Sequence, residues 1–148
     1  MELASLIRPD RVLLGLRARD KAQALHALAA HAAAALDMDV GAILTPLVAR
    51  ERLGSTGLGR GFALPHARIE RLDHFFSLFA RLARPIPFEA VDGQPVDIFC
   101  LLLIPARPGD DHVAGLAAIA RRMRDAATLA AIRSAPDAAS IHALLVEA

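Results

Sequence analysis

Residues 97–105 constrain the fold of this 148-residue chain more than any other stretch. They read DIFCLLLIP, so apolar side chains stand at successive positions and not only at alternate ones. Such a run is typical of a strand that is covered on both faces. We therefore predict a central strand here. We expect Cys100 to belong to the core, because no acidic, imidazole and thiol trio surrounds it.

The first half of the chain predicts two helices. Residues 21–36 form an amphipathic segment in which Asp20 and Gln23 occupy capping positions. Its apolar face consists of Leu25, Leu28, Ala32 and Leu36. Asp39 is expected to cap a second helix that continues toward Leu53. Pro46 lies inside that pattern, so the helix either begins near Thr45 or is kinked.

Further strands and helices complete an α/β pattern. Val12–Leu16 is a short apolar run that predicts an edge strand, and residues 74–82 alternate in the manner of a strand. A helix is expected after residues 108–111, and two short helices are expected at residues 128–133 and after residue 137. The apolar face of the first of these consists of Val113, Leu116, Ile119, Ala120 and Met123. Three arginines (Arg121, Arg122 and Arg124) are expected on a solvated face, and His142 is expected to be exposed. The pattern predicts an α/β domain.

Composition excludes several classes of function. The net charge is +1 and the pI is about 8.1, with scattered Lys and Arg, so nucleic acid is not an expected partner. A single cysteine fits a reducing compartment. No signal peptide is recognisable, and no apolar run reaches the roughly 20 residues that span a bilayer. We expect a soluble, cytoplasmic protein without membrane insertion.

Residues 50–68 carry the clearest indication of chemistry. They read RERLGSTGLGRGFALPHAR, in which Gly57, Gly59 and Gly61 predict a tight loop after a helix. Glycines allow close approach to a ligand, and amide groups in such a loop can surround an anion. Arg50, Ser55 and Thr56 add hydrogen-bond donors. His66 follows a proline and can act as a nucleophile toward phosphorus, because neutral imidazole is abundant at pH 7.

This stretch allows other interpretations besides a phosphoryl site. A Walker loop would end in Gly-Lys-Ser/Thr, and no lysine lies here. A dinucleotide fingerprint would follow a strand and open a helix, which is the reverse of this order. The glycines could simply connect two elements, with His66 on the surface and Arg50 stabilising the negative end of a helix. A metal site built from His66, His112 and the neighbouring aspartates lacks a diagnostic spacing.

The motif of residues 50–66 resembles the enzyme IIA domains of the bacterial phosphotransferase system, in the fructose, mannitol and nitrogen-regulatory class. It reads R-E-x-x-G-S-T-x-x-G-x-G-x-A-x-P-H. The later segments PIPFEAVDGQPVDIFCLLLIPA and Asp111-His112-Val113 resemble the second half of the same family. The similarity extends from about Asp20 to the end. It implies one phosphotransferase-system IIA type 2 domain over residues 1–148, an α/β single domain with a mixed sheet of about five strands flanked by helices on both faces.

The resemblance also assigns roles to individual residues. It implies that His66 is the phosphorylated nucleophile, through its Nε2 atom, and that His112 is a supporting histidine. The phosphoryl-binding residues that it implies are Arg50, Gly54, Ser55 and Thr56. Ala67 departs from the family pattern, in which glycine is common after the active histidine.

The predicted function is that of a histidine phosphocarrier in the phosphoenolpyruvate-dependent phosphotransferase system, and thus of a phosphotransferase component. It needs no metal or other cofactor. The donor is expected to be a phosphohistidine carrier protein (HPr-like), and the recipient either a regulated protein target or a IIB domain. A domain without a linker to a IIB partner resembles the nitrogen-regulatory type most. The alternatives are a sugar-specific IIA subunit of fructose or mannitol uptake and an interaction module that is never phosphorylated.

Overall fold

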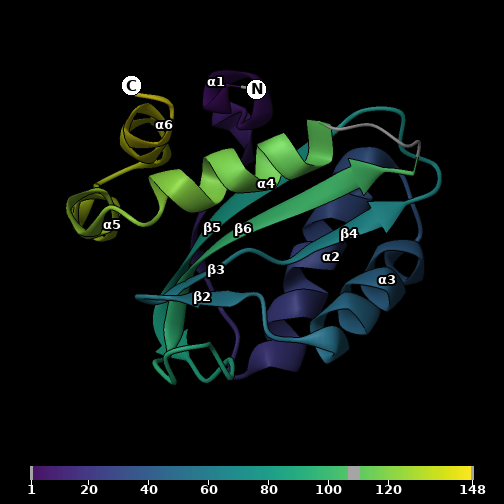
Figure 1. The fold of residues 1–148 in the computed structure, drawn as a ribbon, viewed down its shortest axis with the longest axis horizontal. Coiled ribbons are helices and arrows are strands. Elements are labelled where there is room, and N and C mark those ends of the chain that lie inside the picture. The colour runs from purple at the N-terminus through teal and green to yellow at the C-terminus, as the bar shows by residue number, and fades with distance from the viewer. Residues whose placement is uncertain (1, 107–110, 148) are drawn as a thin grey trace.

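The computed structural model describes residues 2–106 and 111–147, except for the side chains of residues 111 and 112. Figure 1 shows helices on both sides of one sheet. In chain order the elements are α1 (Leu3–Leu6), the 3-10 helix η1 (Pro9–Arg11), β1 (Val12–Leu16), α2 (Lys21–Leu36), α3 (Val40–Leu53), β2 (Gly57–Gly59), β3 (Phe62–Ala63), β4 (His66–Ile69), β5 (Phe76–Ile86), β6 (Val96–Pro105), α4 (Asp111–Arg122), α5 (Ala126–Ser134) and α6 (Ala138–Val146).

The sheet is mixed and has the strand order β1-β5-β6-β3-β2, with β4 also paired to β6. β5 runs antiparallel to β6, whereas β3 and β4 run parallel to it, and β1 is a parallel edge strand beside β5. The predicted α/β class and the edge strand Val12–Leu16 are therefore confirmed. The described part of the chain contains six strands instead of about five, because residues 57–63 form a hairpin where a loop was predicted.

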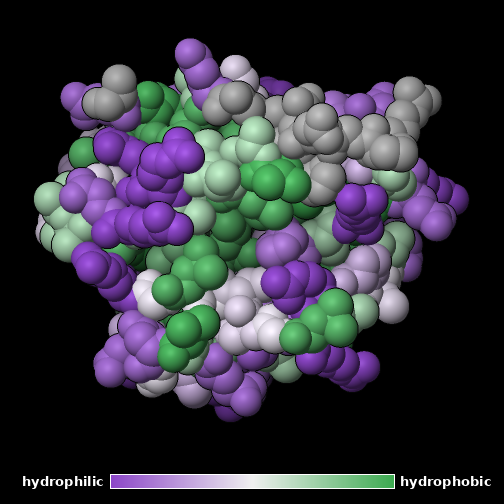
Figure 2. Space-filling view, viewed as in Figure 1, coloured by the Kyte–Doolittle hydropathy of each residue, from purple (hydrophilic) through white to green (hydrophobic). Residues whose placement is uncertain are grey.

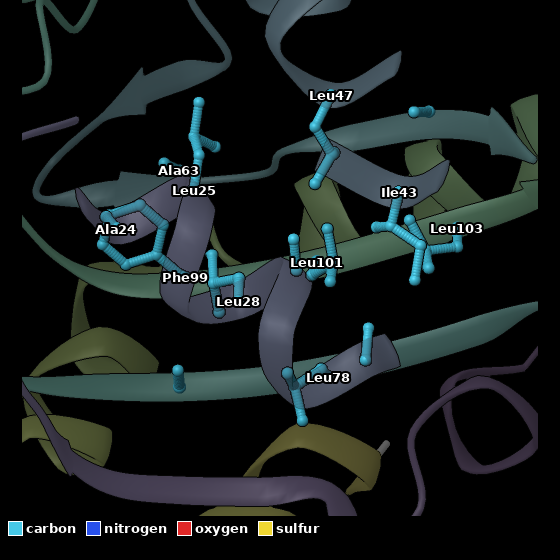
Figure 3. Packing of buried hydrophobic residues seen from close by; sticks show 14 of the residues in the cluster. Ala24, Leu25, Leu28, Ile43, Leu47, Ala63, Leu78, Phe99, Leu101 and Leu103 are labelled. Carbon is cyan, nitrogen blue, oxygen red and sulfur yellow. The ribbon is translucent and has the colours of Figure 1, made fainter. Parts of the chain in front are cut away.

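β6 is the central strand that its sequence predicts. Phe99, Leu101 and Leu103 face α2 and α3 in one hydrophobic cluster, as the side chains in Figure 3 show. Ile98, Cys100, Leu102 and Ile104 belong to a second cluster under α4, α5 and α6. Burial raises the pKa of the Cys100 thiol to about 12, so this side chain stays protonated in the core.

The two helices on one face of the sheet begin at the predicted caps. The Asp20 carboxylate accepts the backbone N–H of Gln23 at 2.9 Å, and the Asp39 carboxylate accepts that of Gly41 at 3.1 Å. α3 runs from Val40 to Leu53 with Pro46 in its interior, so the alternative start near Thr45 is wrong. The proline is tolerated because packing of one face of α3 outweighs one missing hydrogen bond.

Two side chains of the C-terminal helices, one in α4 and one in α6, are less exposed than the sequence predicts. Both Nε and Nη2 of Arg122 donate to the Leu144 carbonyl, at 3.1 and 2.6 Å, so Arg122 does not lie on a freely solvated face. His142 Nε2 lies 3.0 Å from the carbonyl oxygen of Ile7. These contacts join α4 to α6 and α6 to the N-terminal segment, and sequence periodicity has no means of indicating such pairings.

The helices are short. α2 has 16 residues and α3 has 14, whereas crossing a bilayer takes roughly 20 apolar residues. Within the described ranges, no helix combines the length and the hydrophobicity that a membrane span requires.

We predict that Leu101→Ala lowers the free energy of unfolding by about 2–5 kcal/mol, because it leaves a cavity in the central strand, where Leu101 is fully buried. Leu53→Ala is the matched control, since this leucine is 85% exposed at the end of α3, and it is expected to change stability by less than about 0.5 kcal/mol. Urea denaturation followed by circular dichroism measures both. Equal destabilisation of the two variants would contradict the central position of β6.

Candidate functional site

The candidate site lies where the end of α3 meets the start of β4. His66 is the first residue of β4 and pairs in parallel register with Leu102 of β6. The Leu102 N–H donates to the Pro65 carbonyl at 3.0 Å, which fixes the backbone just before His66. Arg50 lies in the last turn of α3, as predicted. The sheet therefore brings together residues that lie 16 positions apart in the chain.

Both ring nitrogens of His66 have defined partners. Nδ1 lies 2.8 Å from the Leu64 carbonyl oxygen, and Nε2 lies 3.3 Å from Nε of Arg50. A carbonyl only accepts and a guanidinium only donates, so Nδ1 carries the hydrogen and Nε2 presents its lone pair. This tautomer leaves Nε2 as the nitrogen able to attack an electrophile.

The pKa of His66 is lowered from its usual 6.5, and burial of the ring is the largest cause. The Arg50 cation lowers it further, whereas the hydrogen bond to Leu64 and the Glu51 carboxylate raise it. The neutral imidazole therefore predominates at pH 7. A neutral ring beside a fixed cation combines a nucleophile with a group that attracts an anionic substrate.

The loop after α3 is held by the two last-turn residues Arg50 and Glu51. Arg50 Nη1 donates to the Gly54 carbonyl at 2.9 Å. Thr56 is 3% exposed and donates its N–H and its hydroxyl to the Glu51 carboxylate. The Ser55 hydroxyl lies near the Phe88 carbonyl at 3.4 Å and accepts the N–H of residue 57. The predicted phosphoryl-binding residues thus lie together, although the donors of Thr56 already have partners.

Glu51 is a site residue that sequence reasoning missed. It is only 8% exposed, an unusual position for a carboxylate. The Arg-Glu pair of the motif could have indicated Glu51, but a glutamate in the last turn of a helix is usually solvated and so drew no functional prediction. Only the structure shows that Glu51 turns inward toward Thr56 and Lys21.

The glycine-rich residues 57–61 form part of a hairpin, and this corrects the predicted tight loop. Gly59, Arg60 and Gly61 have φ angles of 108°, 57° and 79°, the left-handed conformation that allows the chain to reverse. A Cβ on Gly57 would lie 2.7 Å from the Cβ of Ala90, so the absence of a side chain permits close packing there. These glycines shape and pack the hairpin beside the site.

His112 lies in the first turn of α4, at the helix start that its sequence predicts. Its side chain lies outside the described residues, as do the whole of residues 107–110. The supporting role of His112 therefore stays a prediction.

A shallow groove of about 350 Å³ opens beside His66 between the hairpin and α4. Figure 2 shows apolar surface at the centre of this face, between more hydrophilic areas. Leu58 and Val113 are 48% and 61% exposed, so Val113, which belongs to the predicted apolar face of α4, lies at the groove and not in the core. The lining residues are Arg50, Ser55, Thr56, Leu58, Leu64, His66, Val113, Leu116, Ala117 and Ala120. Such a face suits a protein partner.

The fold and this site define a class of protein. A family model described as phosphoenolpyruvate-dependent sugar phosphotransferase system, EIIA 2, matches residues 5–148. The chain therefore belongs to this EIIA family of phosphotransfer components, as the sequence motif predicts.

The chain is similar to nitrogen regulatory proteins over its whole length. It is 43% identical to the nitrogen regulatory protein of Bradyrhizobium diazoefficiens over 145 residues, which cover 98% of this chain and 95% of that protein. It is 34% identical to the nitrogen regulatory protein of Pseudomonas aeruginosa, with 99% and 96% coverage. The crystal structure of nitrogen regulatory protein IIA-Ntr from Neisseria meningitidis superimposes with a TM-score of 0.90, at 26% identity, and covers 95% of this chain and 97% of that one. The likeness to the nitrogen-regulatory type is confirmed.

We predict that His66 titrates below pH 6.5, because its buried ring beside Arg50 resists protonation. If the neutral ring accepts the phosphoryl group, acceptance is expected to persist to lower pH than it would with a histidine of ordinary pKa. Two-dimensional ¹H–¹⁵N NMR of the ring nitrogens measures the titration, and the His66→Ala spectrum assigns the resonance. A midpoint at or above 6.5 would contradict this electrostatic account.

Proposed function

We propose that this protein accepts a phosphoryl group on Nε2 of His66 from a phosphohistidine carrier protein (HPr-like). The observation that supports this most is the pairing of the two ring nitrogens. Nδ1 is occupied by the Leu64 carbonyl, while the Nε2 lone pair accepts from the groove residue Arg50, which has to release it before Nε2 attacks phosphorus. Phosphoryl transfer asks mainly for positioning and charge stabilisation, and a shallow site suffices for both.

The chemical step is a displacement at phosphorus. The Nε2 lone pair of His66 forms the new P–N bond, and the P–N bond of the donor phosphohistidine breaks. The electron pair of the broken bond returns to the donor's ring nitrogen, so no metal or nucleotide enters the balance. The Leu64 carbonyl keeps the Nδ1 hydrogen and stabilises the positive charge that develops on the ring.

Arg50 supplies the fixed positive charge. Its guanidinium can turn from Nε2 to the phosphoryl oxygens, to which it offers planar paired donors. Ser55 lines the same groove, and its hydroxyl, which donates to the Phe88 carbonyl at a long 3.4 Å, can turn to a phosphoryl oxygen. Thr56 and Gly54 are proposed to act through the shape of the loop, because Thr56 donates to Glu51 and the Gly54 carbonyl accepts from Arg50. His112 remains a proposed supporting group.

The proposed role is regulatory. Full-length relatives carry the name nitrogen regulatory protein, which favours this role over sugar uptake. Phosphorylation would add about −1.5 to −2 charges beside an apolar groove, enough to repel or recruit a partner's surface. The protein would then bind regulated targets in one phosphorylation state and release them in the other.

We expect wild-type protein to gain one phosphate when incubated with phosphoenolpyruvate and the upstream phosphoryl donors, and His66→Ala to gain none, because the nucleophile is gone. Intact-mass spectrometry measures the gain, and acid treatment is expected to reverse it. His31→Ala is the matched control, since His31 is exposed on α2, and it is expected to be labelled like wild type. Full labelling of His66→Ala, or no labelling of wild type, would refute the proposed function.

We also expect unmodified protein and His66→Ala to capture target proteins that the phosphorylated protein does not capture, because the added charge lies in the groove. Affinity capture followed by quantitative mass spectrometry measures the difference. Identical captures would contradict the regulatory role. Rapid transfer of the phosphoryl group to a sugar-specific IIB domain, with support of sugar uptake, would replace it by a transport role.

A further inference from the structure

An ion pair lies behind the proposed phosphoryl site, with the Glu51 side chain buried and the Lys21 side chain partly buried. The Oε2 atom of Glu51 accepts from Nζ of Lys21 at 2.9 Å, and the lysine comes from the first turn of α2. Both Glu51 oxygens lie 3.1 Å from the Thr56 N–H, and Oε1 accepts the Thr56 hydroxyl at 2.5 Å. The Lys21 ammonium also lies 4.8 Å from the centre of the Phe88 ring. The hydrogen bonds described for this carboxylate thus join three segments: α2, the end of α3 and the loop at Thr56.

Removing these charges from water costs free energy, so a benefit other than stability is expected from the ion pair. A carboxylate that is 8% exposed loses most of its hydration, and a buried ion pair often stabilises a protein no more than apolar residues of the same size would. Burial of the charge is offset by the ammonium and by two charge-assisted hydrogen bonds from Thr56. What the pair provides beyond stability is a single position for residues 54–56.

The position of Arg50 depends on the same contacts. Arg50 and Glu51 are adjacent at the end of α3 and form hydrogen bonds to opposite ends of one loop. Arg50 binds the Gly54 carbonyl, and Glu51 binds Thr56. The guanidinium that binds Gly54 through Nη1 also reaches Nε2 of His66 through Nε. A shift of the loop would therefore move Gly54 and with it the guanidinium at His66.

We propose that Glu51 is a positioning residue for phosphoryl transfer, and that Lys21 holds it in place. Glu51 acts through Thr56 and Arg50 and does not touch the phosphoryl group. This inference rests on the proposed phosphorylation of His66. It adds a specific requirement: the pair behind the site governs the rate of the transfer step more than donor binding. Neither Glu51 nor Lys21 lines the groove, and the apolar lining residues Leu58, Val113 and Leu116 come from β2 and α4.

Glu51 also acts on His66 through its charge. Among the described residues, the charged groups that shift the pKa of His66 are Arg50, which lowers it, and Glu51, which raises it, both from α3. Replacing Glu51 by the neutral, similarly shaped glutamine is therefore expected to lower the pKa of His66 further.

The experiment compares single-turnover phosphoryl transfer from the phosphorylated donor to wild type, Glu51→Gln, Lys21→Met and Lys21→Arg. At saturating donor, Glu51→Gln is expected to be roughly tenfold to a hundredfold slower, since small misplacements of catalytic groups have effects of this size. The donor concentration that gives half the maximal rate is expected to change much less than the rate, because most of the apolar lining of the groove lies on β2 and α4. Lys21→Met is expected to be slowed, and Lys21→Arg to recover most of the rate, because arginine restores the cation.

Glu89→Gln is the matched control. Glu89 lies 3.5 Å from the same Lys21 ammonium, but its side chain is 87% exposed and it makes no described contact with the loop. It is expected to transfer at the wild-type rate. An equal slowing by Glu89→Gln and Glu51→Gln would show that only the charge around Lys21 matters, and this would overturn the positioning role.

The double variant Glu51→Gln/Lys21→Met covers the case in which a single change unfolds the protein, because it leaves no unpaired buried charge. It is expected to fold by circular dichroism and to stay slow. A folded double variant with the wild-type rate overturns the inference about Glu51 while the phosphocarrier function stands. If wild type itself gains no phosphate, both proposals fail.

Discussion

The covering of β6 on both faces is the constraint on which the rest of the molecule depends. Its side chains fill two hydrophobic clusters, one beneath α2 and α3 and one beneath α4 to α6. Because β6 also pairs with β3, β4 and β5, it sets the register of the strands on both sides. His66 begins one of those strands, opposite Leu102. The position of the proposed phosphoryl acceptor is thus a consequence of the core.

At the site, the consecutive residues Arg50 and Glu51 carry opposite charges and have different roles. Arg50 faces His66 and the groove, where it favours the neutral ring and can meet an anionic group. Glu51 faces inward, where Thr56 and Lys21 satisfy it. A helix end can present neighbouring residues in different directions because they are about 100° apart around the axis. One turn of α3 therefore supplies both the charge of the site and its support.

The sequence predicts those features that follow from periodicity or from local chemistry. The run from Ile98 to Ile104 predicts the central strand, and Asp20 and Asp39 predict two helix starts, because each depends on neighbours in the chain. The sequence does not indicate that Glu51 turns toward Lys21 or that His142 reaches Ile7, since these contacts join segments that are distant in the chain. The hairpin was missed because glycines permit a loop or a turn equally well.

The proposed function depends on which atom of which residue carries the phosphoryl group. Long-range ¹H–¹⁵N correlation and ³¹P coupling on protein phosphorylated by its upstream donor and labelled with ¹⁵N-histidine answer this directly. We predict that phosphorus couples to Nε2 of His66, while Nδ1 keeps its hydrogen, as its 2.8 Å contact with the Leu64 carbonyl requires. Coupling to Nδ1 of His66, or to a nitrogen of any other histidine, would contradict the account.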